Sequence, residues 1–427
     1  MHSHAERGNE ETMKNRRSTR RHWLGHGAVT CLAAVAAVSS AACEREGDAG
    51  GLTPRASDST ARAASKSLAS DAWPTFRGGP TCDGVAASEL PDKPEVIWRR
   101  SFKDTSFEAT ATIVDGTVYI GALDGGDFYA LDLATGEERW KFHTDLGFKA
   151  AAAVRDGVVY VGDTDGKFYA FDAATGDVKW SLAIDNEISA GANFYRDKLD
   201  QDKLLFTCEN GNLYCVEPAD GKKVWSYSID NLLRCSPCVA GDRGFLAGCD
   251  GRLHIVNLDD GSGVDQIDIQ DPTLSTPAAI GDMVYFGTQG SRFCGVKWRE
   301  KRIDWTFEPK NKGQQVKSSA AVAEGLVVFG GKDKLIHALD AATGAEVWST
   351  PVKAPIDSSP VVAGKRVFIG TDRGQLVSVD LKTGEQVWQY EAGGRFDASP
   401  AVAAGKLVIG NDAGDLYCFG AKEGDRR

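Results

Sequence analysis

A unit of about forty residues recurs eight times between Phe107 and the end of the chain. Each copy holds four short runs in which apolar and polar residues alternate, separated by turns such as Asp372-Arg373-Gly374 and Lys382-Thr383-Gly384. This alternation predicts β-strands, and the Gly-rich turns predict hairpins. Four strands per forty-residue repeat predict an all-β fold, an eight-bladed β-propeller with four-stranded blades. The copies begin near Phe107, Phe148, Ile188, Leu233, Thr273, Val316, Ile356 and Phe396.

The two ends of the repeat array indicate how the propeller closes. The last copy has three strand-like runs, which end with Asp415–Phe419, and no tryptophan follows them. Upstream of the first copy, residues 95–102 (EVIWRRSF) resemble the fourth strand of the other copies, such as Gln386–Tyr390. We therefore expect this N-terminal strand to complete the last blade, so that the propeller spans residues 95–427 and has no open edges.

A sequence pattern within the repeats identifies a family resemblance. The pattern Ala-x-Asp-x-x-Thr-Gly-x-x-x-Trp stands, for example, at Ala130 to Trp140 and at Ala338 to Trp348. It resembles the tryptophan-docking repeat of the pyrroloquinoline-quinone-like eight-bladed propellers. The resemblance implies that each outer-strand tryptophan packs against a neighbouring blade, where its N–H needs an acceptor. The tryptophans expected to dock are Trp98, Trp140, Trp180, Trp225, Trp305, Trp348 and Trp388.

Residues 1–43 have the features of an export signal. A basic stretch from Met13 precedes an apolar run from Gly27 to Val38 and small residues before Cys43. Residues 19–24 (TRRHWL) resemble the twin-arginine motif, with an ordinary secretory signal as the alternative. Residues 40–43 (SAAC) resemble a bacterial lipobox, which implies lipidation of Cys43; the alternative is cleavage by ordinary signal peptidase.

Two further segments separate this signal from the repeats. Residues 44–70 are rich in Ala, Ser, Gly and charge without periodicity, which predicts a flexible tether. Residues 71–94 contain Trp73-Pro74 and are interpreted as an N-terminal extension that packs on the propeller. We expect a protein on the periplasmic side of a bacterial membrane, held by a lipid anchor. Glu44 after the cysteine favours the outer membrane by analogy with enteric bacteria, and the inner membrane stays open.

Residues that could carry chemistry are sparse. The net charge of −11 argues against nucleic acid or anionic lipid as the ligand. The repeat region holds His143, His254 and His337 in separate copies, and it has no nucleophile elbow or phosphate-binding loop. We therefore expect no catalytic, cofactor-binding or metal-binding residues. Cys235-Ser-Pro-Cys238 has CxxC spacing; buried thiols or a structural disulfide are favoured over a redox pair or a metal site.

The family resemblance leaves more than one class of function open. One branch contains the propeller lipoproteins of the outer-membrane β-barrel assembly machinery, and another contains the quinoprotein dehydrogenases. The enzymes carry long loops and often two adjacent cysteines at the quinone. Here the loops are short and no two cysteines are adjacent. We expect a monomeric, non-enzymatic scaffold without a cofactor that binds an envelope protein such as a β-barrel assembly component; the alternatives are a quinoprotein-related enzyme and a ligand-sensing propeller.

Two adjacent repeats deviate from the pattern and suggest a partner surface. In the fourth copy Val264 stands near the expected tryptophan, and in the fifth copy residues 299–302 replace Thr-Gly. Drift in a tolerant blade is the alternative explanation. In the barrel-assembly lipoproteins a Leu-x-Leu-Arg stretch faces the barrel partner, and this resemblance implies partner-binding roles for Leu232, Leu233 and Arg234. For Leu233 the alternative is a core position.

Overall fold

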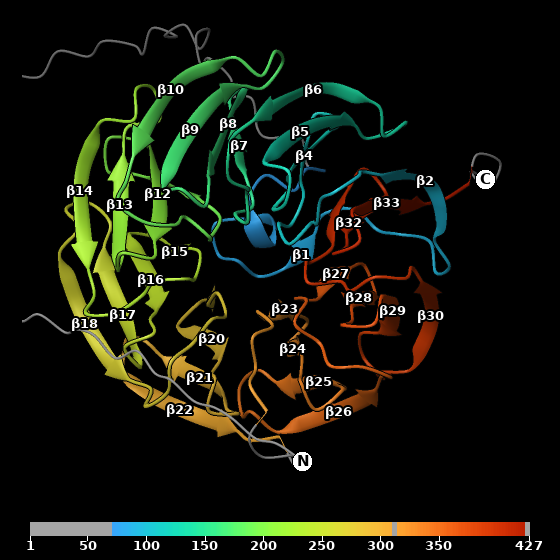
Figure 1. The fold of residues 1–427 in the computed structure, drawn as a ribbon. Coiled ribbons are helices and arrows are strands. Elements are labelled where there is room, and N and C mark those ends of the chain that lie inside the picture. Colours follow the sequence, from blue (N-terminus) through green and yellow to red (C-terminus); the bar gives the residue numbers. More distant parts are fainter. Residues whose placement is uncertain (1–70, 310–313, 423–427) are drawn as a thin grey trace, which may run out of the picture. The chain divides into compact units, whose positions relative to one another are not determined.

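The computed structural model describes residues 71–309 and 314–422. These residues form one short 3-10 helix, η1 (Phe76–Gly78), and the strands β1 to β33. The strands build eight separate sheets, and Figure 1 shows the sheets arranged as a ring around a central axis. The predicted all-β, eight-bladed propeller with four-stranded blades is therefore confirmed. No helix in the described part of the chain is long and apolar enough to cross a membrane.

Each blade is an antiparallel sheet whose first strand faces the axis, as the ring in Figure 1 shows. Blades 1 and 2 consist of β3 (Thr112–Val114), β4 (Thr117–Gly121), β5 (Asp127–Asp132), β6 (Glu138–His143), β7 (Ala153–Arg155), β8 (Val158–Gly162), β9 (Lys167–Asp172) and β10 (Val178–Ala183). Blades 3 and 4 consist of β11 (Asn193–Arg196), β12 (Asp202–Cys208), β13 (Asn212–Val216), β14 (Lys223–Ser228), β15 (Cys238–Ala240), β16 (Arg243–Ala247), β17 (Arg252–Asn257) and β18 (Gly263–Asp268).

The second half of the ring repeats this order. Blades 5 and 6 consist of β19 (Ala278–Ile280), β20 (Met283–Gly287), β21 (Phe293–Lys297), β22 (Arg302–Phe307), β23 (Ala321–Ala323), β24 (Leu326–Gly330), β25 (Leu335–Asp340) and β26 (Glu346–Pro351). Blades 7 and 8 consist of β27 (Val361–Ala363), β28 (Arg366–Gly370), β29 (Gln375–Asp380), β30 (Gln386–Glu391), β31 (Ala401–Ala403), β32 (Lys406–Gly410), β33 (Asp415–Gly420) and β2 (Glu95–Ser101). Two strands thus precede blade 1, and one of them belongs to blade 8.

The ring closes through the N-terminal strand β2. It pairs antiparallel with β33, so that Trp98 lies opposite Cys418 and Ser101 lies opposite Asp415. The Arg99 guanidinium also contacts the Asp415 carboxylate at 2.7 Å. Blade 8 therefore contains strands from both ends of the propeller, as the sequence predicts, and β33 is covered by a fourth strand like the third strands of the other blades.

The blades are held together by tryptophans that stack on glycines of the next blade. The Trp140 indole N–H donates to the Ala173 carbonyl at 3.0 Å. A Cβ atom on Gly176 would lie 2.7 Å from the Trp140 ring, and Gly176 has φ +80°. The Thr-Gly turn therefore needs glycine both for its backbone conformation and for room. The same N–H bond joins Trp98 to Leu133, Trp180 to Pro218, Trp225 to Leu258, Trp305 to Ala341 and Trp348 to Leu381, while Trp388 packs on Phe419 at 5.7 Å.

The contact between blades 4 and 5 is built differently. Asp265, not Val264, occupies the tryptophan register, because it lies opposite Ile255 as Trp225 lies opposite Cys215. Lys301 stands where the other turns have glycine, and its φ is +58°. Its ammonium lies 2.7 Å from the Asp265 carboxylate. An ion pair has thus replaced the tryptophan–glycine stack.

The buried apolar side chain at the contact between blades 4 and 5 belongs to blade 5. Trp298 of blade 5 packs back on Phe245 of blade 4, with ring centroids 5.4 Å apart. It joins the buried cluster that contains Ile255 and Ile267 of blade 4. The tryptophan that stabilises this contact is therefore supplied by the following blade instead of the preceding one.

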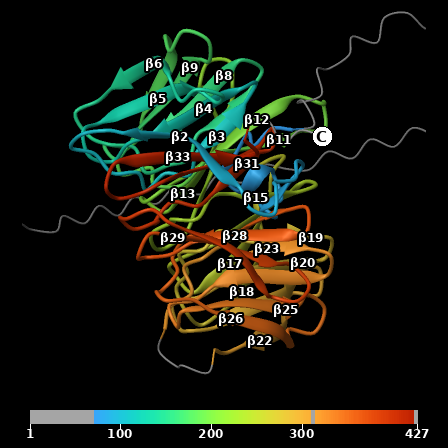
Figure 2. The same ribbon diagram turned by 90° about the vertical axis from the view of Figure 1, so that its right-hand side faces the viewer.

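Residues 73–86, which we call the plug, lie inside the ring, as β1 (Val85–Ala86) and η1 do in Figures 1 and 2. One N–H of the inner strand donates to a plug carbonyl in six blades. The pairs are Ile113 to Trp73, Val154 to Pro74, Val239 to Pro80, Ala279 to Thr81, Val322 to Asp83 and Val362 to Gly84, at 2.8 to 3.0 Å. The plug thereby satisfies backbone donors that would otherwise face an open channel.

Arg77 is the most deeply buried charge of the plug. Its side chain is 1% exposed, and desolvation lowers its pKa to about 10. The guanidinium donates to the carbonyls of Ala320 at 2.9 Å and of Pro360. These carbonyls belong to the chain that leads into blades 6 and 7, so Arg77 links the plug to both.

We expect Trp348→Ala to lower the free energy of unfolding by about 3–5 kcal/mol, because it removes a large buried ring and the indole N–H that donates to the Leu381 carbonyl. The matched control is Asp265→Ala at the equivalent register of blade 4. It removes only an ion pair, which is worth about 1 kcal/mol or less. Urea unfolding of both variants measures the difference. Equal losses would show that the tryptophans do not hold the blades together.

We expect Gly176→Ala to destabilise the protein more than Gly157→Ala. Both glycines have positive φ, at +80° and +74°, so both substitutions impose a similar backbone penalty of about 1–2 kcal/mol. Only Gly176 faces a tryptophan, whereas a Cβ on Gly157 would meet nothing within 4 Å. The difference in urea midpoint isolates the crowding of Trp140, which should add about 1–3 kcal/mol. Indistinguishable midpoints would contradict the stacking role of this glycine.

Candidate functional site

The second residue of each repeat lies at one mouth of the central channel. Each connection from an outer strand to the next inner strand crosses the same face, because every blade has four antiparallel strands. The eight side chains therefore form a circle, which we call the mouth ring. They line a cavity of about 180 Å³. The ring consists of Glu108, Lys149, Ser189, Arg234, Leu274, Lys317, Asp357 and Asp397.

The cavity has a floor made by the plug and by a belt of hydroxyl groups. Backbone N–H groups donate to the hydroxyl of the next blade, from Ser236 to Thr276, Thr276 to Ser319, Ser319 to Ser359 and Ser359 to Ser399, each at 2.9 Å. In blades 2 and 3 the same place is held by Ala151 and Gly191. Phe76 lies there, since a Cβ on Gly191 would be 3.0 Å from its Cβ. The plug therefore fills the gap in the belt.

The basic members of the mouth ring are paired within the chain. Lys149 contacts Glu187 at 3.2 Å, and Arg234 contacts Glu209 at 2.8 Å. Ser189 also donates to Glu209, at 2.8 Å. The hydrogen bond to Glu209 raises the pKa of Arg234. These cations are thus compensated before any ligand approaches.

The acidic members lie next to one another in blades 7, 8 and 1. Burial raises the pKa of Asp397, and Asp372 and Asp357 raise it further, while Arg395 opposes them. Burial also raises the pKa of Glu108. One half of the mouth therefore carries an excess of negative charge.

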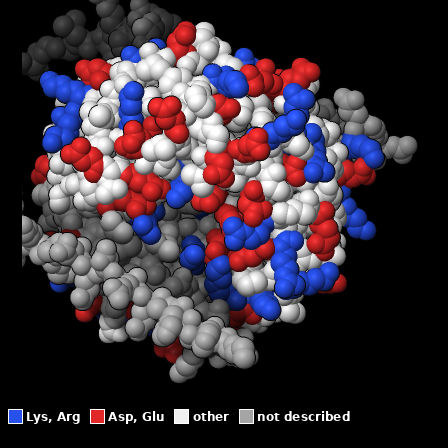
Figure 3. Space-filling view, in the orientation of Figure 1, with Lys and Arg blue, Asp and Glu red and all other residues white. Residues whose placement is uncertain are grey.

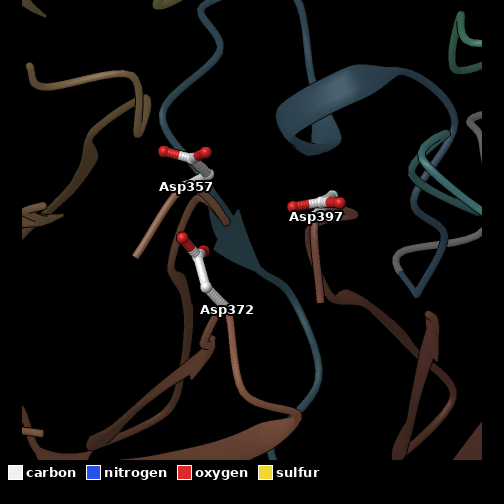
Figure 4. Close-up of side chains that lie close together, drawn as sticks. All are labelled: Asp357, Asp372 and Asp397. Atoms are coloured by element: carbon white, nitrogen blue, oxygen red, sulfur yellow. The ribbon is translucent and has the colours of Figure 1, made fainter. Parts of the chain in front are cut away.

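Three carboxylates in this half come close enough to hold a cation. Oxygens of Asp357, Asp372 and Asp397 lie within 4.8 Å of one another. Figure 4 shows these three side chains. Hard cations prefer such oxygen ligands. However, the Lys332 ammonium already lies 2.5 Å from Asp357 and 2.9 Å from Asp372. Lys332 thus supplies a positive charge where a metal ion would otherwise be needed.

The structure separates the residues that the sequence suggests for partner binding. Arg234 is exposed, with 42% of its side chain accessible, and Leu232 is half-buried. Leu233 is 1% exposed and belongs to the core between blades 3 and 4. The expectation that Leu233 contacts a partner is therefore corrected, because its buried side chain packs in the core between blades 3 and 4. Cys43 lies outside the described residues.

The mouth ring itself was not predicted from the sequence. The signal was present, since the second position of the repeat is charged in six of the eight copies. A polar residue that recurs beside a core position at every repeat marks an exposed circle in a propeller. The charges in Figure 3 are otherwise interspersed, with acidic and basic side chains mixed over the face shown.

The histidines do not gather into a site. His337 bonds Asp333 and Glu346, each at 3.0 Å, and is 1% exposed. His254 bonds Asp250 at 2.8 Å and Tyr227 at 2.9 Å. They belong to blades 6 and 4, and both are buried among fixed partners. Such histidines stabilise their turns and do not face the cavity.

The CxxC pair lies in the core. Cys235 and Cys238 are both fully buried, and burial raises the pKa of Cys235 to about 12. A thiol of this kind is neither a good nucleophile nor a good metal ligand. The pair is thus suited to a structural role.

Solved structures of similar fold include two kinds of protein. BamB from Moraxella catarrhalis matches with a TM-score of 0.66 and 16% identity, over 78% of this chain and 99% of that one. Quinohemoprotein alcohol dehydrogenase from Comamonas testosteroni matches with a TM-score of 0.67 and 14% identity, over 82% and 81%. A europium-containing methanol dehydrogenase matches with a TM-score of 0.67 and 14% identity, over 82% and 98%. At these identities the likeness concerns the fold.

Sequence comparison adds a short match and a long one. The dehydrogenase subunit of a quinone alcohol dehydrogenase from Gluconacetobacter polyoxogenes is 31% identical over 114 residues, and this chain spans only 15% of its length. A profile of the family described as outer membrane protein assembly factor BamB matches residues 85–232 and 230–427. Because the two segments together cover most of the chain, the protein belongs to the family of the outer membrane protein assembly factor BamB.

Proposed function

We propose that this chain is a non-enzymatic scaffold of the bacterial cell envelope that binds a protein partner at the channel mouth. The observation that carries this proposal is the structure of the mouth: the plug closes it from inside the channel, and its basic side chains form ion pairs within the chain. The plug forms its floor, Lys149 and Arg234 have acidic partners, and the cavity measures about 180 Å³. Pockets that enclose small ligands measure about 300–1,000 Å³. Such a mouth favours contact with a surface over enclosure of a small molecule.

A quinoprotein dehydrogenase is the main alternative, because several fold relatives are such enzymes. Pyrroloquinoline quinone is a tricarboxylate, and it needs unpaired cations around it. The mouth offers the reverse, with adjacent acids at Asp357, Asp397 and Glu108. In addition, the buried Oδ1 atoms of Asp357 and Asp372 have no hydrogen-bond partner among the described residues, so an added anion would be repelled. The residues present do not fit this cofactor, and we derive no redox step for the chain.

Arg234 is the residue best placed to meet a partner. It is exposed on the connection into blade 4, and the half-buried Leu232 lies beside it in the chain. Arginine next to apolar surface is a frequent composition of interface hot spots. A partner carboxylate could share the guanidinium with Glu209 through its remaining donors. The family description points to a component of outer-membrane protein assembly as this partner.

The cellular address follows from residues 1–43, which lie outside the described part of the chain. The basic, apolar and small-residue segments end at Cys43. We propose export and a lipid anchor at this cysteine, with the propeller held on the periplasmic side of the outer membrane. The tether 44–70 would separate the anchor from the propeller.

We expect Arg234→Glu combined with Leu232→Ala to weaken partner capture by about tenfold or more, because the hot spot loses its cation and an apolar contact. The readout is recovery of β-barrel assembly proteins from detergent-solubilised membranes with the tagged full chain. The control is Arg395→Ala, an exposed arginine on the connection between blades 7 and 8. An unchanged melting temperature shows that the fold is intact. If the folded double variant recovers the same proteins at the same yield, Arg234 is not part of the interface.

We expect Cys43→Ser to move the protein from the membrane fraction to the soluble fraction, because a lipid on this cysteine would be the proposed anchor. The measurement is fractionation of cells that express the full chain, with immunoblotting of both fractions. Cys31→Ser serves as the control, since that cysteine lies within the apolar run of the signal. A variant that stays in the membrane fraction like the parent would contradict lipidation at Cys43.

A further inference from the structure

Two cysteines from distant parts of the chain meet beside the channel. Cys82 belongs to the plug, and Cys238 begins β15 in blade 4. Both are buried, at 1% and 0% exposure, and they belong to the same apolar cluster. The Cys238 thiol donates to the carbonyl of Thr81, the residue directly before Cys82, at 3.3 Å. Cys238 is the second cysteine of the CxxC motif. It therefore has two candidate partners, Cys235 in the motif and Cys82 in the plug.

The backbone on both sides is fixed by bonds that do not involve the Cys82 thiol. The Val239 N–H donates to the Pro80 carbonyl at 2.8 Å. The Asn193 side-chain amide donates to the carbonyls of Pro80 and Pro237, each at 2.9 Å. One asparagine thus holds the residue two positions before Cys82 and the residue directly before Cys238. The juxtaposition of the thiols is therefore enforced from outside the pair.

The conformation of Cys82 suggests that its side chain has a specific use. Its φ is +54°, in the left-handed region that disfavours residues with a Cβ. Elsewhere in the plug this region is occupied by Gly78 and Gly84 as well as by Arg77. A glycine at position 82 would adopt this backbone without strain. The thiol therefore has to contribute something that glycine lacks.

We propose that Cys82 and Cys238 are joined by a disulfide that ties the plug to blade 4. This inference rests on the proposed export, because disulfides persist in oxidising compartments. The step is a thiol–disulfide exchange with a disulfide-bearing oxidant, such as a dithiol oxidase or oxidised glutathione. The two thiols lose two protons and two electrons and form one S–S bond, and the oxidant's disulfide is reduced to two thiols.

The bond forms while the chain is still folding. Burial and the neighbouring Cys82 thiol raise the pKa of Cys238 well above its usual range, so the folded protein offers little thiolate for attack. Because both cysteines are buried, reductants reach the finished bond slowly. The disulfide would close a loop that includes blades 1 to 3 and would keep the plug in the channel.

The first test maps the bond in the full mature chain after refolding with oxidised and reduced glutathione. Non-reducing tryptic digestion followed by mass spectrometry should yield one cross-linked species containing Cys82 and Cys238, which separates on reduction. Cys235→Ser should retain this species, and Cys82→Ser or Cys238→Ser should abolish it. Recovery of all described cysteines as free thiols would overturn the proposal. So would a bond between Cys235 and Cys238 inside the single peptide 235–243.

The second test measures what the bond does. The oxidised protein should melt about 5 °C or more above the reduced protein. Cys82→Ser and Cys238→Ser should remove this difference, whereas Cys215→Ser, a buried cysteine of blade 3, should leave it unchanged. Equal melting temperatures of the oxidised and reduced parent would overturn the locking role.

A third measurement separates this inference from the proposed function. The cross-link should be present in full-length protein isolated from the envelope fraction of cells after rapid alkylation of free thiols. If the bond forms on refolding but is missing from protein isolated from cells, the exported location is wrong while the pairing of the two cysteines stands. If the protein is exported and the bond forms in neither sample, the pairing is wrong and the scaffold proposal is unaffected.

Discussion

The tryptophan–glycine stack between neighbouring blades is the interaction on which this propeller depends. Each blade buries its two faces only against its two neighbours. The stability of the ring therefore depends on the contact between every pair of neighbouring blades. The repeated N–H bonds to the next blade, such as Trp140 to Ala173, fix the angle and spacing of the sheets as well as burying apolar area. The strand β2 supplies the same interaction where the two ends of the propeller meet, because its Trp98 docks on blade 1 through the Leu133 carbonyl. The contact between blades 4 and 5 lacks the stack, since Asp265 takes the place of the tryptophan and Lys301 that of the glycine. Trp298 of blade 5 supplies the apolar area there instead.

A ring of eight blades leaves a channel, and the plug determines what this channel can do. Inner strands present backbone donors to the axis, and an extended segment with free carbonyls satisfies them without regular strand pairing except at β1. Arg77 is buried without an ion-pair partner within 4 Å among the described residues, and carbonyls are its acceptors. Its charge is tolerable only because the plug holds it in place. With the axis filled by residues 73–86, the mouth ring and the outer surfaces are the parts of the described ring that we consider for partner binding.

The period of the sequence predicted the fold because each repeat carries its own strand and turn signals. The closing strand was recognisable for the same reason, since residues 95–102 match a strand that the last copy lacks. The plug was not predictable in detail, because it contacts six blades through one or two backbone hydrogen bonds each and has no periodic pattern. Val264 is one residue from the tryptophan position, because the four-residue spacing from Gly136 to Trp140, applied from Gly261, leads to Asp265. Leu233 was assigned to the partner surface through the resemblance to the Leu-x-Leu-Arg stretch, whereas the alternative, a core position like that of Ile356, is the one its burial supports.

The scaffold brings one side chain per blade to the mouth, because each connection supplies one residue to the mouth ring. Substitutions at these eight positions change the charge of the mouth without changing the tryptophans that join the blades. In this chain the cations Lys149 and Arg234 are held by Glu187 and Glu209, and the acids of blades 7, 8 and 1 stand together. Paired charges on rigid connections disfavour a buried anion, yet they can exchange partners with an approaching protein surface at little cost. The arrangement that disfavours an anionic quinone at the mouth is therefore the one on which we base the proposal of a protein partner.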